Sequence, residues 1–334
     1  MATTKIQAAT QTAKRSFSAG SVISAIGRWI VRNRIYLIAF AIPAVLTYLA
    51  YALFGLYPFG EESVLCLDLN GQYVYYFEAL RDAFWGDGSI FYNWSRNLSG
   101  EFMGIIGYYL ASPFTLIVML LPEKFMLSSL LIMQLCKLGA AGATFNYFLQ
   151  KRRGVQPYPS LLFSTMYAMM AYGVIQLIDP MWLDGLVFLP LIMLGIEYLV
   201  DDGRRLNFII PLALMCVANF YIGYMICFFV ILYFLFYLCF GSDKKRKGYD
   251  YFTAFVRIAY SSVIALACAA FMLLPVYNAL KLGKFEFTDP DYSFRFQSFP
   301  LSKKLLENAQ DSPLLVFLCD LLDMFPQLRH SMTL

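Results

Sequence analysis

Charged residues and histidine are scarce in this sequence. Charged side chains make up 14% of its 334 residues, whereas a soluble globular chain carries about 25%. The only histidine is His330, near the C-terminus, which excludes metal clusters built on histidine and argues against a Ser-His-Asp triad. Hydrophobic residues make up 60% of the chain. So little polar surface predicts an all-α polytopic membrane protein.

Motifs for disulfide, zinc and nucleotide chemistry are also missing. The seven cysteines are an odd number, most of them lie in apolar runs, and no two have the CxxC spacing. Neither a disulfide framework nor a zinc site is therefore expected. The sequence contains no P-loop, no GxGxxG and no HExxH motif. We expect no nucleotide-driven chemistry and no nucleic-acid partner.

Uncharged or nearly uncharged stretches predict about seven transmembrane helices. A helix needs about 20 apolar residues to cross the hydrocarbon core. Residues 207–240 would be about 51 Å long as one helix, so we predict two spans that turn near residues 219–223. The other predicted spans are residues 35–56, 125–149, 158–178, 186–200 and 258–280.

Basic residues predict the orientation, because Lys and Arg accumulate on the cytoplasmic side of a membrane. Residues 102–122 are uncharged but contain Gly104, Gly107 and Pro113. If residues 102–122 do not cross the membrane but form an interfacial or re-entrant helix on the outer face, four groups of basic residues all lie on the cytoplasmic side. We therefore predict that this segment does not cross. These groups lie at residues 1–34, 151–153, 204–205 and 244–247.

Four regions follow from this orientation. Residues 1–34 are predicted to form a cytoplasmic basic tail, and residues 35–280 a transmembrane domain. Residues 57–124 form a large first extracytoplasmic loop within that domain. Residues 281–334 are predicted to be an extracytoplasmic tail.

Acidic and aromatic residues alternate in the predicted first outer loop. Carboxylates accept hydrogen bonds from sugar hydroxyls or bind cations, and rings stack on sugars, so this composition suits a polyhydroxylated substrate. A solvated loop with interfacial aromatics is the alternative. Asp68 is a single acid in an apolar strip. It is either a general base or metal ligand, or the N-cap of a helix over residues 69–80.

Lys137 lies in the middle of the predicted span 125–149. A charge at that depth is costly and is by default a functional hypothesis. Its partner is either a phosphate of a lipid-linked substrate or Glu197, in an internal ion pair. The small residues 139–143 allow another helix to approach closely, which favours a Lys137 that faces protein.

Five groups of residues stand out in combination. They are DLNGQY at 68–73, FYNWS at 91–95, YYLASPF at 108–114, WLDGLVFLPLIMLGIE at 182–197 and NFYIGYM at 219–225. Together they resemble the YfhO family of bacterial membrane proteins, and the resemblance covers about residues 35–295. Members of this family are much longer, and they are similar to the GT-C superfamily of glycosyltransferases, in which a large first outer loop bears the catalytic acid.

The resemblance implies a GT-C-like fold and an integral membrane glycosyltransferase. Such an enzyme would move a sugar from an undecaprenyl-phosphate donor to a cell-surface glycopolymer such as lipoteichoic acid, in the cytoplasmic membrane of a Gram-positive bacterium. By motif position, Asp68 and Asp184 would be catalytic acids of an inverting transfer, with Asp68 as base or as ligand of a divalent cation. The implied contacts to substrate are Gln72, Tyr73, Trp94, Tyr109 and Lys137.

Two other classes of function stay open. A transporter or flippase for a lipid-linked saccharide would use Lys137 and Glu197 as groups inside the membrane. A non-catalytic scaffold is the third candidate, because the chain loses the family pattern after about residue 296 and resembles a truncated or divergent member.

Overall fold

The computed structural model describes residues 19–63, 65–94, 100–242 and 248–281. The chain divides into two compact units, Met1–Ala279 and Leu280–Leu334, and the first of them forms the helical bundle. The predicted tail 281–334, the basic run 244–247 and the first 18 residues lie outside the described residues, except for residue 281.

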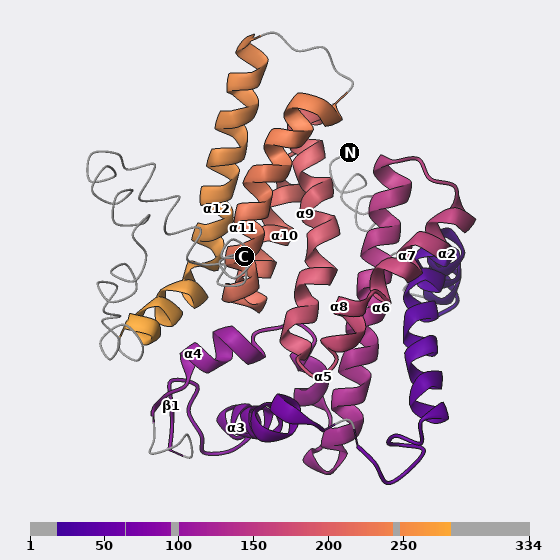
Figure 1. Ribbon diagram of the computed structural model, residues 1–334, viewed down its shortest axis with the longest axis vertical. Helices are drawn as coiled ribbons and strands as arrows, with labels where there is room; N and C mark the ends of the chain where they lie inside the picture. Colours follow the sequence, from indigo (N-terminus) through magenta and orange to yellow (C-terminus); the bar gives the residue numbers. More distant parts are fainter. Residues whose placement is uncertain (1–18, 64, 95–99, 243–247, 282–334) are drawn as a thin grey trace, which may run out of the picture. The chain divides into compact units, whose positions relative to one another are not determined.

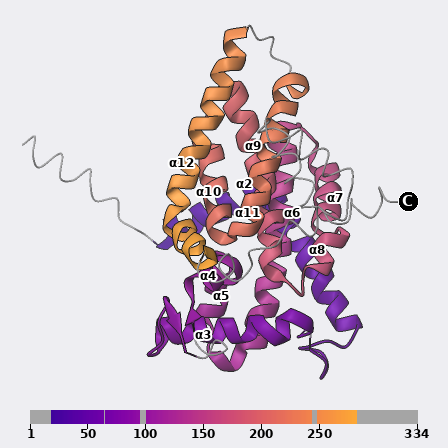
Figure 2. The ribbon, with the colours of Figure 1, turned by 60° about the vertical axis from the view of Figure 1, so that its left-hand side comes forward.

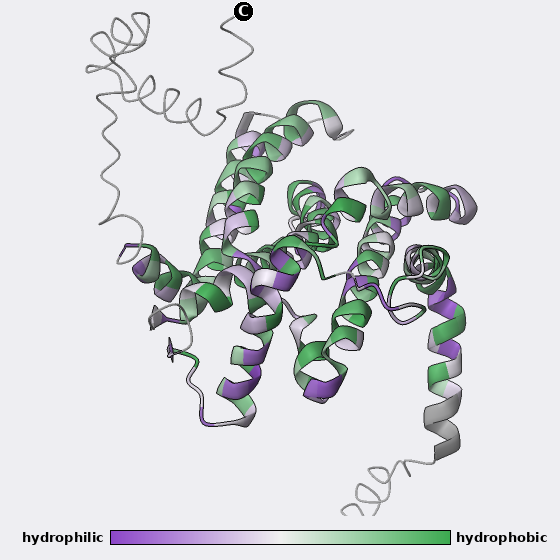
Figure 3. Ribbon diagram, turned by 60° about the horizontal axis from the view of Figure 1, so that its bottom comes forward, coloured by the Kyte–Doolittle hydropathy of each residue, from purple (hydrophilic) through white to green (hydrophobic). Residues whose placement is uncertain are grey.

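Five of the described helices are long and apolar enough to cross a membrane (Figure 1), and the chain is thus an all-α polytopic membrane protein. Figure 3 shows that hydrophobic residues cover most of their ribbon. The five are α2 (Ala19–Leu53), α6 (Met126–Arg152), α9 (Leu183–Asp202), α11 (Phe220–Phe236) with the π-helix η5 (Tyr237–Gly241), and α12 (Gly248–Leu280).

Two further predicted spans are shorter than expected. The segment 158–178 is divided into α7 (Pro157–Ala168) and α8 (Ala171–Ile175) by a tight turn. The two helices lie so close that a Cβ at Gly173 of α8 would be 2.2 Å from the Ala168 carbonyl oxygen of α7. Helix α10 (Leu206–Ala218) has 13 residues and is about 20 Å long. The predicted number of about seven membrane segments is reached only if α10 and the α7–α8 pair are added to the five long helices.

The predicted turn between α10 and α11 is confirmed. It falls at Asn219, whose backbone is extended (φ −156°, ψ 112°) and whose side chain caps α11 by accepting a hydrogen bond from Ile222 N. Asparagine is a preferred N-cap because its side-chain oxygen satisfies a free N–H of the first helical turn.

Helix α2 begins at Ala19, well before the predicted start of the first span. Residues 19–34 of the predicted tail therefore continue the spanning helix. Helices α2 and α6 pack so closely that a Cβ at Gly142 of α6 would lie 2.6 Å from the Ala39 carbonyl oxygen of α2. The small residues of α6 permit this approach, as predicted.

Short elements make up the long connection between α2 and α6. In Figures 1 and 2, α3 lies across the end of the long helices. The segment 102–122 is broken around Pro113, and none of the described candidate spans includes it; its place relative to the bilayer stays a prediction. The elements are η1 (Leu69–Tyr73), α3 (Val74–Trp85), the hairpin β1 (Tyr92–Asn93) and β2 (Gly100–Glu101), α4 (Met103–Ile105), η2 (Ile106–Leu110), α5 (Thr115–Leu120) and η3 (Glu123–Phe125).

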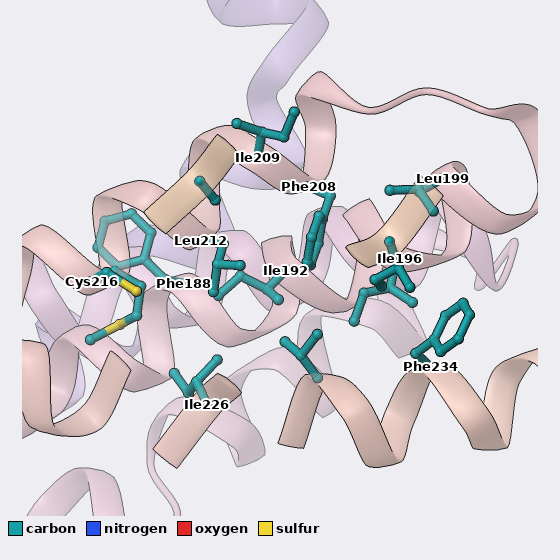
Figure 4. Packing of buried hydrophobic residues seen from close by; sticks show 14 of the residues in the cluster. Phe188, Ile192, Ile196, Leu199, Phe208, Ile209, Leu212, Cys216, Ile226 and Phe234 are labelled. Atoms are coloured by element: carbon teal, nitrogen blue, oxygen red, sulfur yellow. The ribbon is translucent and has the colours of Figure 1, made fainter. Parts of the chain in front are cut away.

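A large buried cluster of the described residues lies among α9, α10, α11, η5 and α12. Figure 4 shows Ile192 and Ile196 of α9 between side chains of α10 and α11. Lipid tails are as apolar as these side chains, so helix association in a bilayer depends on close packing rather than on removal of water. This packing fixes the helix ends that carry the polar residues described below.

Cysteine labelling tests the predicted orientation. In a chain without its seven native cysteines, we expect Asp87→Cys to react with an impermeant maleimide added outside the cell. Arg204→Cys should react only after permeabilisation, because basic loops stay cytoplasmic. Both positions are exposed. Labelling of position 204 from outside would mean that the segment 102–122 crosses the membrane.

Candidate functional site

Three segments far apart in the sequence meet at the end of the bundle that carries the long connection. They are η1, η2 and the turn that leads into the 3-10 helix η4 (Pro180–Trp182). Tyr109 of η2 contacts both Gln72 and Tyr73 of η1, and the Asp179 carboxyl interacts with Tyr73 and Asp68. We call the following residues the Asp68 cluster: Asp68, Gln72, Tyr73, Tyr108, Tyr109 and Asp179.

Asp68 is exposed and lies at one end of a hydrogen-bond chain. Gln72 Nε2 donates to Asp68 Oδ1 at 3.0 Å, and the Tyr109 hydroxyl donates to Gln72 Oε1 at 2.8 Å. These two hydrogen bonds orient the Asp68 carboxylate, which would otherwise rotate freely in solvent. Three of the predicted site residues, Asp68, Gln72 and Tyr109, are thus brought together.

The alternative prediction that Asp68 caps a helix is wrong. Its side chain makes no capping hydrogen bond, and its backbone is already helical (φ −65°, ψ −31°), whereas an N-cap has non-helical dihedrals. Leu67, just before it, has φ +48°. The left-handed region costs a residue with a Cβ about 1–2 kcal/mol, so Asp68 is presented by a strained backbone, which is typical of functional sites.

Asp179 is the second acid of the cluster. Burial raises the pKa of the Asp179 carboxyl, the negative charge of Asp68 raises it further, and interaction with the Tyr73 hydroxyl lowers it. Asp179 Oδ1 and the Tyr73 hydroxyl are buried, and within the described part of the chain neither completes a hydrogen bond of good geometry. Unsatisfied polar atoms beside two interacting carboxyls indicate a ligand site.

Tyrosine rings form one wall of the cluster. Tyr109 contacts Tyr73, Tyr76 and Tyr108 with ring centroids 5.1, 4.9 and 4.7 Å apart. Burial and the neighbouring hydroxyls raise the pKa of Tyr109 to about 12, and burial with Tyr221 raises the pKa of Tyr108. These hydroxyls therefore stay protonated at neutral pH and can donate hydrogen bonds to a substrate.

The junction of α10 and α11 supports this wall. Asn219 Nδ2 donates to the Tyr108 carbonyl oxygen at 2.8 Å, while Asn219 Oδ1 caps α11. The Tyr221 ring lies 6.0 Å from that of Tyr108 and 5.6 Å from that of Trp182. One asparagine thus turns the chain and anchors η2, a second role that the sequence did not indicate.

Lys137 and Asp184 form a buried ion pair. Lys137 Nζ lies 2.8 Å from Asp184 Oδ2, with side-chain exposures of 2% and 0%, and it also donates to the Pro180 carbonyl oxygen at 2.8 Å. Ser112 donates to Asp184 Oδ1 at 2.8 Å. The partner of Lys137 is therefore Asp184, and the predicted pairing with Glu197 is wrong.

Glu197 belongs to a second ionic network, at the opposite end of α9. Its fully buried carboxylate accepts from Arg152 Nε at 2.8 Å and from an Arg153 nitrogen at 2.5 Å, and from the Tyr233 hydroxyl at 2.5 Å. Arg152 also pairs with Asp201. This network joins α6, α9 and α11.

Trp94 is not brought into the Asp68 cluster. It follows β1, is 80% exposed, and its ring contacts Tyr92 at 4.9 Å. Its predicted contact with sugar or lipid stays a prediction.

The fit to a divalent cation rests on two carboxyls. Among the described residues, no three His, Cys, Asp or Glu side chains come together to hold a metal ion. The negative charge of Asp68 acts on the Asp179 carboxyl, and Asp179 Oδ1 is a buried oxygen that completes no hydrogen bond of good geometry with the described residues. Two carboxylates suit Mg²⁺, which usually takes one or two from the protein and completes its shell with water and substrate phosphate.

Asp179 is the residue that sequence reasoning missed. Both acids of the segment DPMWLD at 179–184 were visible, but Asp184 stands in the motif and Asp179 precedes a proline. Pro180 starts η4, which leaves Asp179 in the turn and sends Asp184 into the first turn of α9. Pro180 was the signal in the sequence that Asp179 lies in a turn and not in a helix.

The fold and this site define a multi-pass membrane protein with a tyrosine-lined acidic site at one end of its helices. The chain belongs to a family known as bacterial membrane protein YfhO, whose model matches residues 39–308. The match extends beyond residue 295, where the resemblance was expected to end.

A curated relative is the uncharacterized protein YfhO of Bacillus subtilis (strain 168). It is 27% identical over 168 residues, which cover 45% of this chain and 19% of the relative. The aligned region thus spans about a fifth of that protein. No solved structure gives a significant match.

Proposed function

We propose that this protein is a glycosyltransferase that moves a sugar from an undecaprenyl-phosphate donor to an extracytoplasmic polymer such as lipoteichoic acid. Membership of the YfhO family supports a bacterial multi-pass membrane protein. The similarity of that family to GT-C enzymes supports the reaction class. The observation that carries the proposal is that the Asp68–Gln72–Tyr109 hydrogen-bond chain joins η1 to η2, beside the turn that carries Asp179, whose carboxyl is within range of the negative charge of Asp68.

The chemistry needs a base on the acceptor side. Asp68 would take the proton of an acceptor hydroxyl while the oxygen of that hydroxyl attacks the anomeric carbon of the donor sugar. The new bond joins acceptor oxygen to that carbon, the bond from the carbon to the phosphate oxygen breaks, and undecaprenyl phosphate leaves with the electron pair. Asp68 then releases the proton to water. Its exposure and the hydrogen bond from Gln72 suit this role.

Asp179 would stabilise the phosphate side of the reaction through a divalent cation. In the alternative in which Asp68 is a metal ligand and not the base, Asp68 and Asp179 would hold the ion, which would supply positive charge to the leaving phosphate, and water would take the acceptor proton. The tyrosine hydroxyls of the cluster would donate to sugar or phosphate oxygens. Asp184, which is fully buried against Lys137, would have a supporting role.

No specific observation favours the transporter alternative. It would need Lys137 and Glu197 as substrate-responsive groups, yet both are engaged in buried ion pairs with other helices. Membrane vesicles that contain the protein should transfer labelled sugar from a polyprenyl-phosphate donor to a glycopolymer acceptor. Movement of donor across the bilayer without transfer would favour the transporter, and neither activity would favour the scaffold.

The pH dependence of transfer tests Asp179. The pKa of the Asp179 carboxyl is raised, so as pH falls Asp179 becomes protonated at a higher pH than an ordinary aspartate. If transfer needs the Asp179 carboxylate, the rate of transfer should therefore decrease at that higher pH. We call this decrease the acidic limb of the pH profile. Asp179→Asn should remove this limb together with most activity. In residual activity of Asp68→Asn the limb should move to lower pH, because the negative charge of Asp68 is gone. An unchanged limb in Asp179→Asn would contradict the assignment.

A further inference from the structure

We propose that the buried Lys137–Asp184 pair positions the two walls of the Asp68 cluster, so that Lys137, Asp184 and Ser112 are positioning residues of the transferase. This inference rests on the proposed function. The pair is fully buried and is hydrogen-bonded to both segments that carry the walls of the cluster.

The first connection leads to Asp179. Lys137 Nζ donates to the carbonyl oxygen of Pro180, the next residue along the chain, at 2.8 Å. The same ammonium group lies 2.8 Å from Asp184 Oδ2, so a single cation holds both the start of η4 and the first turn of α9. Because the Asp179 carboxyl stands one residue before this anchor, its place relative to α6 depends on Lys137.

The second connection leads to the tyrosine wall. Ser112 donates to Asp184 Oδ1 at 2.8 Å, and its Oγ also accepts from Phe114 N at 3.3 Å. Ser112 follows η2 by two residues, and η2 carries Tyr108 and Tyr109. Both oxygens of the Asp184 carboxylate are thus used, one toward α6 and one toward η2.

Stability alone does not explain a pair built in this way. A buried ion pair can often be replaced by apolar residues of similar volume without loss of stability, whereas removal of one partner is strongly destabilising. Apolar residues would restore the packing but not the bonds to Pro180 and Ser112. A double replacement therefore separates the contribution of the pair to folding from its contribution to the site.

The experiment compares Lys137→Met, Asp184→Leu and the double variant with the parent. Thr144→Val on α6 is the control, because it removes a half-buried hydroxyl that bonds only within its own helix, to the Ala141 carbonyl oxygen. We expect both single variants to lose stability and the double variant to regain it. We expect transfer by the double variant to stay down by about 100-fold, the cost of a misplacement of about 1 Å. Parental transfer together with parental stability would overturn the proposal.

A second readout does not depend on activity. Asp179→Cys, in a chain without native cysteines, reports the exposure of that turn to an impermeant maleimide. We expect faster labelling in the Lys137→Met/Asp184→Leu background than in the parent background, because the bond to Pro180 is lost. Equal rates would overturn the proposal. If the parent transfers no sugar, the proposed function fails, but the labelling rates still decide whether the pair positions the turn.

Ser112→Ala serves if the double variant does not accumulate. It keeps the ion pair and cuts the bond to Asp184, so we expect normal accumulation and a fall in transfer of about 10-fold, the size expected for one hydrogen bond to a charged group. Unchanged transfer would show that η2 needs no anchor at Asp184 and would overturn that half of the proposal.

Discussion

Asp68→Asn leaves the protein in the membrane at the parental level and lowers sugar transfer by about 10²–10⁴-fold, the usual contribution of a general base. The replacement keeps an oxygen that can accept from Gln72 Nε2, so the local hydrogen-bond chain survives. Asp68 is exposed, so its charge contributes little to folding. What is lost is the negative charge that takes a proton or holds a cation.

Asp87→Asn is the matched control for this variant. Asp87 is an exposed acid in the same connection, just after α3 and outside the Asp68 cluster, and its replacement should leave transfer near the parental rate. The measurement is initial rate in membrane vesicles at equal protein content. Near-parental transfer by Asp68→Asn would refute Asp68 as the base and move that role to Asp179.

Glu197→Gln lowers stability by about 3 kcal/mol, the lower end of the range for a broken buried ion pair, because it removes the buried charge that Arg152 and Arg153 share, while Arg152 keeps Asp201 and Arg153 is partly exposed. Glu197 has no exposed surface and accepts from Arg152, Arg153 and Tyr233. The side-chain oxygen of glutamine can replace one oxygen of the Glu197 carboxylate, but its NH2 group would face an arginine guanidinium and could not accept a hydrogen bond from it. The connection between α6, α9 and α11 should weaken.

Thermal inactivation of detergent-solubilised protein measures this loss, as the temperature at which half of the protein remains monodisperse after a fixed time. Asp87→Asn is again the control, since Asp87 is an exposed acid outside the arginine network. Parental stability of Glu197→Gln would show that the arginine network does not hold these helices together.

Local signals in the sequence were sufficient for the helical membrane architecture. The 34 uncharged residues from 207 to 240 predicted two helices, and Asn219 caps the second one because an asparagine side chain can satisfy a free N–H within three residues. The small residues 139–143 predicted close helix contact, which Gly142 makes with α2. Each of these features depends on residues that are neighbours along the chain.

The contacts within the site were predicted only in part. The motif at 68–73 pointed to Asp68, Gln72 and Tyr73, which a single helical turn keeps together. Tyr109 joins them across 37 positions of sequence, and only the resemblance to a family had suggested it. Asp184, predicted as a catalytic acid, pairs with Lys137 and Ser112 and not with the Asp68 cluster, because a motif shows which residues belong together but not which way a helix turns each one; its catalytic role stays a prediction.

By itself, the sequence determined that this chain is a helical membrane protein, because burial of backbone polar groups in lipid leaves few alternatives for long uncharged stretches. It also determined that Lys137 needs a partner, since an isolated charge at that depth is costly. Only the tertiary structure decided which partner. Asp184 and Glu197 lie on the same helix, and the packing of α9 against α6 places Asp184 beside Lys137 and Glu197 beside Arg152, because an ion pair requires contact within a few ångströms and sequence spacing does not fix how two helices align.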